Sequence, residues 1–337
     1  MTAAMPIWRH VYRWDLDKTY LATDFEKLSR MVRIAMEGPE DKRNVPGSAA
    51  LLRELTEDRE SEAAARVCIV SGSPRQMRRV LEQKLRADGI TWHEFELKPQ
   101  WKNLRRGRFR AIRDQVGYKL PLLLQSRTRV RPSVRETLFG DDAEADTFIY
   151  ALYADVVAGR VDPATLVKIL KSTSAYPDAI DRCLAAVEKL EPSDAVERIF
   201  IHLDKRTSPA WFAPFGAIVV PVFNYFQAAL VLFSEGHLDV AGVLSVTRAF
   251  READEHDPEE LGNLFQDIQR RGHLATGAMQ RLAEALRERG EPGEDSEVLV
   301  CCEDRHLARG PGARPSEPAP PVERDWMHLV THQRRRS

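Results

Sequence analysis

Short apolar runs and longer segments of helical periodicity alternate along the first 160 residues of the chain. The short runs have the length of buried strands, and they lie at residues 7–14, 66–70, 90–97 and 136–139. Apolar residues recur every three or four positions, as on one face of a helix, at residues 24–37, 48–55, 74–85 and 149–157. Ser73, just before Pro74, is placed to cap the third of these helices. Strands that alternate with helices favour a parallel sheet with crossover helices, so the sequence predicts an α/β domain over residues 1–160.

Helical patterns dominate beyond residue 160 and predict a helical domain of unknown role over residues 161–290. Its helices are expected at 163–172, 177–190, 193–205, 239–254, 258–271 and 276–289. Residues 207–234 carry no charged side chain, but several prolines, Asn224 and Gln227 interrupt the apolar run. We therefore predict a loop or short strand and then a buried helix at 221–235, rather than a membrane span.

Charge and composition restrict the classes of partner and compartment. The 337 residues include 50 Lys plus Arg and 51 Asp plus Glu, so the net charge of -1 does not favour a nucleic-acid partner. The four cysteines form neither a disulfide framework nor a CxxC metal set, and the N-terminus lacks the apolar core of a signal peptide, so we expect a cytoplasmic protein. Proline and glycine cluster beyond Gly290, which predicts a disordered tail over residues 291–337.

One stretch departs from this balance, because residues 98–135 hold twelve Lys and Arg residues and a single acid, Asp114. Such a surface could attract an anionic ligand, a nucleic acid or the anionic face of a membrane, which would make the protein membrane-peripheral. Alternatively, the stretch could be a solvated helical face that acids from elsewhere in the fold balance.

Acids and hydroxyls follow the predicted strands. Asp15 and Asp17 end the first strand, Ser71 follows the second, and Asp141 and Asp142 follow Gly140 at the end of a later one. Because the carboxyl ends of parallel strands meet at one edge of a sheet, these side chains are expected to lie together. Each also has a simpler interpretation as the cap of the next helix or as a turn residue.

A lysine completes the set. Lys119 precedes Leu120-Pro121 and is expected in the first turn of a helix, although Lys102 or another basic neighbour could take its place. In this order the four features resemble the four-motif signature of the haloacid dehalogenase (HAD) superfamily of phosphoryl-transfer enzymes.

Two segments carry a closer resemblance. Ser71-Gly-Ser-Pro and Gly140-Asp-Asp-x-x-x-Asp-x-x-Ile-Tyr are similar to motifs of the catalytic domain of actin-patch-type phosphatidate phosphatases, over about residues 7–160. The resemblance implies a Rossmann-like, HAD-like parallel sheet. The link between Thr19 and Ser71 is short, so only a minimal cap is expected.

The resemblance also implies roles for these residues in a Mg²⁺-dependent phosphatase that acts on a phosphate monoester. Asp15 would attack phosphorus and form an aspartyl-phosphate, and Asp17 would serve as general acid and base. Ser71 and Lys119 would bind the phosphoryl oxygens and balance their charge. The Mg²⁺ ligands would come from Asp15, Asp17, Asp141 and Asp142.

The substrate is less well defined. A phosphorylated small molecule or a phosphatidate-like lipid fits the resemblance, but Lys18 stands where the lipid-phosphatase branch usually has a third acid. Two alternatives therefore remain: a phosphatase for nucleotides or nucleic-acid ends, and a catalytically inactive HAD-like binding protein. His93, His202 and His237 lack the spacing of a metal site.

Overall fold

The computed structural model describes residues 8–22, 43–57, 64–98, 108–254, 257–275, 277–289 and 323–336, without the side chains of 108–114, 254, 258, 289, 335 and 336. The chain divides into two compact units. Unit 1 comprises Met1–Arg43, Asp58–Pro221 and Val322–Ser337, and unit 2 comprises Asn44–Glu57 and Val222–Pro321. The predicted helix at 24–37 lies outside the described residues.

A six-stranded sheet forms the centre of unit 1. Its strands, in spatial order, are β3 (Glu94–Lys98), β2 (Arg66–Pro74), β1 (His10–Trp14), β4 (Arg135–Asp141), β5 (Val196–His202) and β6 (Val219–Val222). β1 pairs in parallel with both β2 and β4, β2 pairs with β3, and β4 with β5. The predicted α/β fold with a parallel sheet is confirmed.

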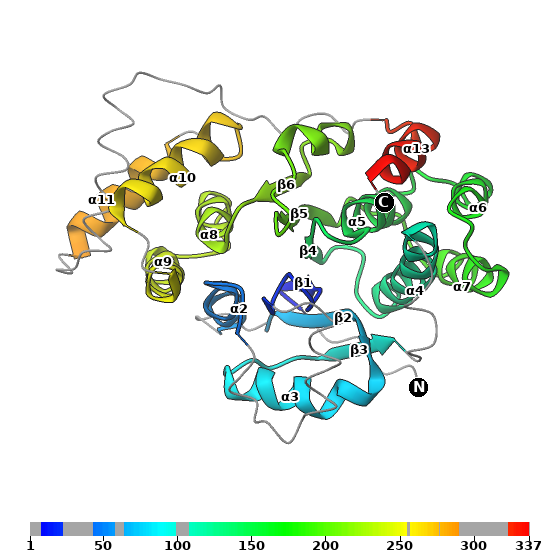
Figure 1. Cartoon of the computed structure of the whole chain (residues 1–337), viewed down its shortest axis with the longest axis horizontal. Helices are drawn as coiled ribbons and strands as arrows, with labels where there is room; N and C mark the ends of the chain where they lie inside the picture. The colour runs from blue at the N-terminus through cyan, green and yellow to red at the C-terminus, as the bar shows by residue number, and fades with distance from the viewer. Residues whose placement is uncertain are drawn as a thin grey trace. The chain divides into compact units, whose positions relative to one another are not determined.

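Helices bury one face of this sheet (Figure 1). α4 (Arg108–Arg127) and α5 (Asp146–Val157) pack on the strands, and α6 (Pro163–Ser172) and α7 (Pro177–Val187) lie outside them. All twelve residues of α5 are buried, as expected for a helix enclosed between a sheet and further helices. Trp14, Phe139 and Phe200 stack across β1, β4 and β5, with ring centroids 4.0 and 5.1 Å apart.

A charged network lies inside this core. The Glu136 carboxylate accepts hydrogen bonds from Arg13 Nε (2.8 Å), Arg13 Nη2 (2.9 Å), Arg127 Nη1 (2.9 Å) and the Tyr153 hydroxyl (2.5 Å). Ser126 Oγ accepts a further bond from Arg13 Nη1 at 2.7 Å. Because every partner is buried, each charge depends on the others for its solvation.

The sheet extends further along the chain than predicted. The helix expected at 193–205 is wrong, because Val196–His202 form β5, and the boundary expected at residue 160 falls inside unit 1. Ile199, Phe200 and Ile201 are all buried. A strand covered on both faces is a continuous apolar run, and its periodicity does not distinguish it from a buried helix.

Lys119 does not open a helix. It lies in the middle of the 20-residue α4, and Pro121 is tolerated inside that helix. A proline removes the amide that would donate to the carbonyl four residues earlier, here that of Gly117. The Arg182 guanidinium of α7 donates to this carbonyl at 3.3 Å and so replaces the missing donor.

The predicted disorder of the tail is wrong for its end. Trp326–Arg336 form α13, which packs on α5 and α6. Its buried side chains include Trp326, Leu329 and Val330, and the Trp326 ring meets that of Phe148 edge-on at 5.6 Å. This apolar face is short and is flanked by arginines, so composition alone conceals it.

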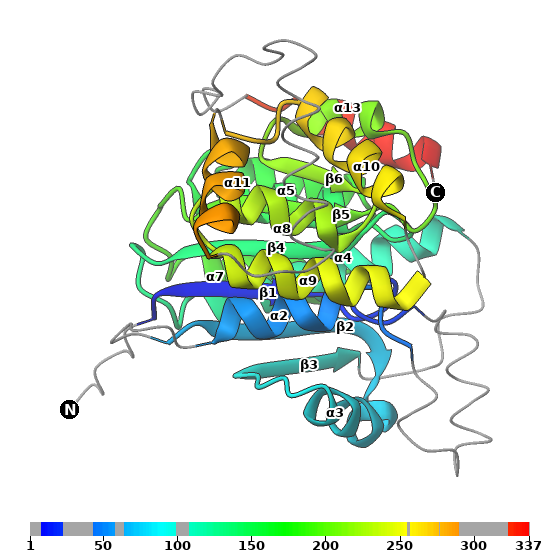
Figure 2. The same cartoon turned by 90° about the vertical axis from the view of Figure 1, so that its left-hand side faces the viewer.

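Unit 2 is helical. It contains α2 (Ser48–Thr56), α8 (Tyr225–Ser234), α9 (Val240–Asp254), α10 (Pro258–Arg270) and α11 (Ala278–Arg289), as the periodicity predicted. α8 is almost entirely buried and lies beside α9 (Figure 2). The predicted buried helix is therefore confirmed, and within the described parts of the chain no helix combines the length and apolarity that crossing a bilayer would need.

Candidate active site

The site begins where β1 ends. The amide of Asp15 still donates to Phe139 O of β4 at 3.0 Å, and the chain then turns back, because the amides of Tyr20 and Leu21 both donate to Leu16 O. This tight turn keeps Asp15 and Asp17 at the carboxyl end of the sheet, and both side chains are buried. β1 is also where the strand order reverses, so the turn occupies the position at which open α/β sheets bind their ligands.

Lys119 lies at the centre of an acidic cluster. Its Nζ is 2.9 Å from Asp15 Oδ1, 2.5 Å from Asp146 Oδ1 and 3.1 Å from Glu144 Oε2. The side chains of Lys119, Asp15 and Asp146 are fully buried, whereas Glu144 is 24% exposed. Of the two lysines considered, Lys119 thus lies beside Asp15, whereas Lys102 lies outside the described residues. The cluster also contains Asp146, the third acid of the Gly140 motif, and Glu144, which sequence patterns did not single out.

Asp17 is held by two serines. Its Oδ2 accepts hydrogen bonds from Ser71 Oγ at 3.1 Å and Ser73 Oγ at 2.8 Å. Ser71 was expected at this site, but Ser73 was expected to cap the next helix. β2 instead continues through Pro74, a 3-10 turn η2 (Arg75–Met77) follows, and α3 (Arg78–Ala87) begins without a side-chain cap.

The two acids after β4 differ in their surroundings. Asp141 Oδ1 accepts bonds from the amides of Ala143 and Glu144, and its Oδ2 accepts a long one, 3.5 Å, from Thr19 Oγ1 in the β1 turn. The amide of Asp141 also donates to Asp146 Oδ2 at 3.4 Å, so Asp141 lies beside the cluster.

Asp142 faces the loop after β5. It accepts bonds from the amides of Lys205 (2.8 Å) and Thr207 (3.1 Å). Asp142 therefore orders this loop, and its role as a metal ligand stays a prediction.

Two buried carboxylate oxygens indicate that the site could bind a cation. Among the described residues, Asp15 Oδ2 and Asp17 Oδ1 are buried and have no hydrogen-bond partner. Oxygens of Asp15, Glu144 and Asp146 also lie within 4.8 Å of one another, a group that could hold a metal ion. Carboxylate oxygens are ligands that Mg²⁺ prefers, and a cation would supply the missing partner, so this donor set fits the expected ion.

The pKa values of the cluster reflect that its acids outnumber its one ammonium group. Burial raises the pKa of Asp15, and Lys119 opposes the rise. Burial also lowers the pKa of Lys119, but Asp146, Asp15 and Glu144 outweigh it and hold that pKa well above its usual value. Asp17 titrates at about 6, since burial raises its pKa while the bond from Ser73 counteracts the rise. One ammonium group therefore does not satisfy the whole cluster.

The departure at Lys18 is compensated within unit 1. Lys18 adopts φ 61° in the turn, and its Nζ lies 3.6 Å from Asp204 Oδ2 in the loop after β5. Its carbonyl is 2.8 Å from His202 Nδ1. A nearby carboxylate thus opposes the positive charge of Lys18. Sequence patterns gave no signal for these partners, because they lie more than 180 residues along the chain from Lys18.

The predicted basic surface is only partly present. Lys119 and Arg127 of this stretch are buried and paired with acids, and Arg129 and Arg135 pair with Glu94 and Glu197. Balance by acids from elsewhere, one of the two expected interpretations, is therefore correct for these four residues. The basic side chains of 102–113 lie outside those described, so membrane contact stays a prediction.

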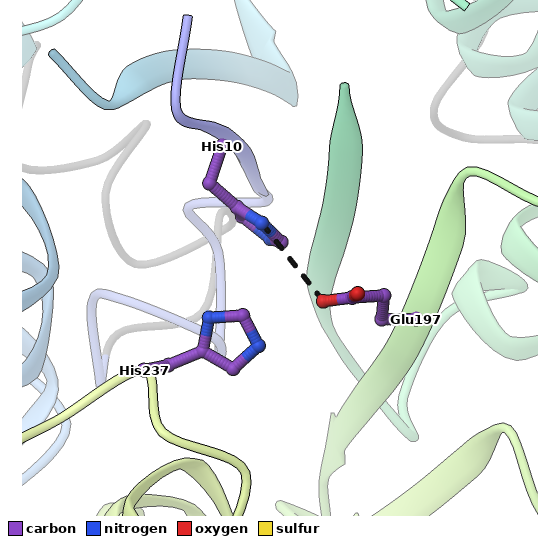
Figure 3. Close-up of side chains that lie close together, drawn as sticks. All are labelled: His10, Glu197 and His237. Carbon is purple, nitrogen blue, oxygen red and sulfur yellow. Dashed lines mark ion pairs between the residues drawn. The ribbon is translucent and has the colours of Figure 1, made fainter. Parts of the chain in front are cut away.

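Among the described residues, the group formed by Asp15, Glu144 and Asp146 includes no histidine. His10, at the start of β1, points toward Glu197 (Figure 3), with 3.9 Å between Nδ1 and Oε2, and its Nε2 is 2.9 Å from Thr137 Oγ1. His237 of the same view follows α8 in unit 2. His93 Nδ1 accepts the amide of Val67 at 3.1 Å.

Comparison with known families finds one match, to the part of the chain that holds this site. The sequence model described as "Phosphatidate phosphatase APP1, catalytic domain" matches residues 14–166. The predicted family is confirmed for this segment. The match to the APP1 catalytic domain runs from the last residue of β1 into α6 and includes helix α2 and every residue of the acidic cluster, but not β5, β6 or helices α8 to α11. Comparisons with curated proteins and with solved structures found no match.

Proposed function

We propose that the protein is a Mg²⁺-dependent phosphatase that hydrolyses a phosphate monoester through an aspartyl-phosphate on Asp15. The match to the APP1 catalytic domain implies phosphatase activity. The observation that carries the mechanism is the pairing at the end of β1: Asp15 lies against the Lys119 ammonium, and Asp17, two residues on, is held separately by hydroxyls.

In this proposal Asp15 attacks phosphorus, and the bond from phosphorus to the leaving alcohol breaks while Asp17 gives that oxygen a proton. Asp17 then takes a proton from water, which attacks phosphorus and releases Asp15. A carboxyl group that titrates at about 6 can do both near neutral pH. Lys119 balances charge on Asp15 and on the phosphoryl oxygens, and Ser71 donates to one of these oxygens.

Asp15, Asp141 and the main-chain carbonyl of Asp17 would hold Mg²⁺. When bound, the ion supplies positive charge to the phosphoryl oxygens. The buried Asp15 Oδ2, which has no hydrogen-bond partner among the described residues, supports this assignment. Asp142 is left out of it, because its two oxygens serve the loop after β5.

The proposed substrate class is a phosphorylated lipid, since the matched family is described as a phosphatidate phosphatase. The test is a release assay for inorganic phosphate over phosphatidate in mixed micelles and over sugar, nucleotide and protein phosphates, each with Mg²⁺ and with excess chelator. Phosphatidate is expected to react fastest and chelator to abolish release. Faster release from nucleotides would favour the nucleotide alternative instead.

Asp15→Asn tests the nucleophile, because the amide keeps the shape of the side chain but not its charge. We expect phosphate release from aryl phosphates to fall by about 10³-fold or more, as for loss of a catalytic nucleophile. Asp181→Asn on the exposed surface of α7 is the matched control and should act as wild type. Equal release by Asp15→Asn and wild type would refute the mechanism, and no release by wild type from any substrate would favour a binding protein.

A further inference from the structure

Two serine hydroxyls donate to the same oxygen of Asp17. Ser71 Oγ and Ser73 Oγ lie 3.1 and 2.8 Å from Asp17 Oδ2. Both serines are fully buried. They lie two residues apart on β2 and so share a face of the strand. A hydroxyl has one proton to donate, so a Ser71 that binds Asp17 cannot donate to a phosphoryl oxygen at the same time.

The other contacts of the two hydroxyls differ. Ser71 Oγ also accepts the amide of Ser73 at 2.9 Å, and this bond fixes the oxygen while its proton can still rotate about the Cβ–Oγ bond. Ser73 Oγ, among the described residues, bonds only to Asp17, and it does so at the shorter distance. The Ser71 hydroxyl can therefore donate to a new acceptor without moving its oxygen, whereas the Ser73 hydroxyl keeps Asp17 as its acceptor.

We propose, on the basis of the proposed function, that Ser73 is the positioning residue of the general acid. When a phosphoryl group binds, Ser71 turns its proton from Asp17 to a phosphoryl oxygen, and Ser73 alone then holds the Asp17 carboxyl group toward the leaving oxygen. No bond other than hydrogen bonds changes in this exchange. Without Ser73, Asp17 would lose the last hydrogen-bond donor that the described residues give it, just when orientation is required.

This division of labour predicts different kinetics for two otherwise similar variants. Protonation by Asp17 matters for a poor leaving group such as an alkyl alcohol and little for dinitrophenol, which leaves as an anion. In Ser73→Ala, kcat/KM should therefore fall about 10- to 100-fold for alkyl phosphates and far less for dinitrophenyl phosphate. Inhibition by orthovanadate, a phosphate mimic, should stay near that of wild type.

Ser71→Ala provides the matched comparison. It should weaken vanadate inhibition and lower kcat/KM for all leaving groups, because it removes a phosphoryl contact. Ser73→Cys keeps the size of the side chain but has a weak donor, so it should behave as Ser73→Ala and excludes a packing effect. The ratio kcat/KM is used because it reports only the steps through formation of the aspartyl-phosphate.

Three results would overturn the inference while leaving the proposed function intact: an equal loss for all leaving groups in Ser73→Ala, a loss of vanadate inhibition equal to that in Ser71→Ala, or no effect at all. A wild-type enzyme without phosphatase activity would instead refute the proposed function itself.

Discussion

Glu136→Gln should be among the most destabilising single-atom exchanges in unit 1. Four hydrogen-bond donors converge on the Glu136 carboxylate, which is completely buried. A glutamine offers one acceptor oxygen and turns an amide N–H₂ group toward the remaining donors. The two guanidinium groups of Arg13 and Arg127 also lose their counter-charge. Breaking a buried ion pair from one side costs about 3–5 kcal/mol.

The pKa of Glu136 gives a second route to this magnitude. Burial would raise that pKa, but the Arg13 guanidinium outweighs it and lowers the pKa from 4.5 to about 2. This difference between the pKa values of the unfolded and folded states corresponds to about 3 kcal/mol of unfolding free energy. Because the pKa is lower in the folded state, this stability is complete above pH 4.5 and is lost as the pH falls from 4.5 through 2.

Tryptophan fluorescence can follow the unfolding of unit 1 in urea, because all six tryptophans belong to that unit. They are Trp8, Trp14, Trp92, Trp101, Trp211 and Trp326. At pH 7 the free energy of unfolding should fall by about 3 kcal/mol in Glu136→Gln, and the gap to wild type should narrow below pH 4.5. The exposed control, Glu191→Gln, should stay within about 0.5 kcal/mol. A loss below about 1 kcal/mol, typical of an exposed pair, or a gap that does not change with pH would refute the reasoning.

Three further variants probe other contacts. Lys119→Met leaves a buried acidic cluster without its ammonium group, so urea unfolding should show a loss of about 3–5 kcal/mol and phosphate release should cease. Gly140→Ala puts a methyl group 2.6 Å from Asp146 Oδ2 and should lower the thermal midpoint, whereas Gly72→Ala, whose nearest neighbour is 3.7 Å away, should not. Trp326→Ala should lower the free energy of unfolding by about 3–5 kcal/mol and release α13 from the core, so that trypsin can cleave at its arginines. A wild-type unfolding curve or digestion pattern would contradict the contact concerned.

The parts of the site that could be predicted carry local signals. Asp15 and Asp141 each follow a short apolar run, and a strand end is recognisable from a few neighbouring residues. Their meeting then follows from the geometry of parallel strands, because the strand ends share one edge. The same argument placed Ser71 correctly.

The parts that could not be predicted depend on distant partners. Ser73 had a good local interpretation as a helix cap, and only the approach of Asp17, 56 residues earlier, gives it another use. Lys119 was expected at a helix start because of Pro121, and the donor that makes the proline tolerable, Arg182, is 65 residues from Gly117. Local patterns report backbone preferences, and these residues are determined by tertiary contacts instead.

β5 limits how the chain can be shortened. A polypeptide that stopped at residue 166, where the family match ends, would lack this strand and leave β4 as a sheet edge with open backbone groups, which invites pairing with other chains and aggregation. It would also lose the amides of Lys205 and Thr207 that hold Asp142. Fragments intended to isolate the chemistry must therefore extend beyond Thr207, well past the segment that sequence comparison delimits.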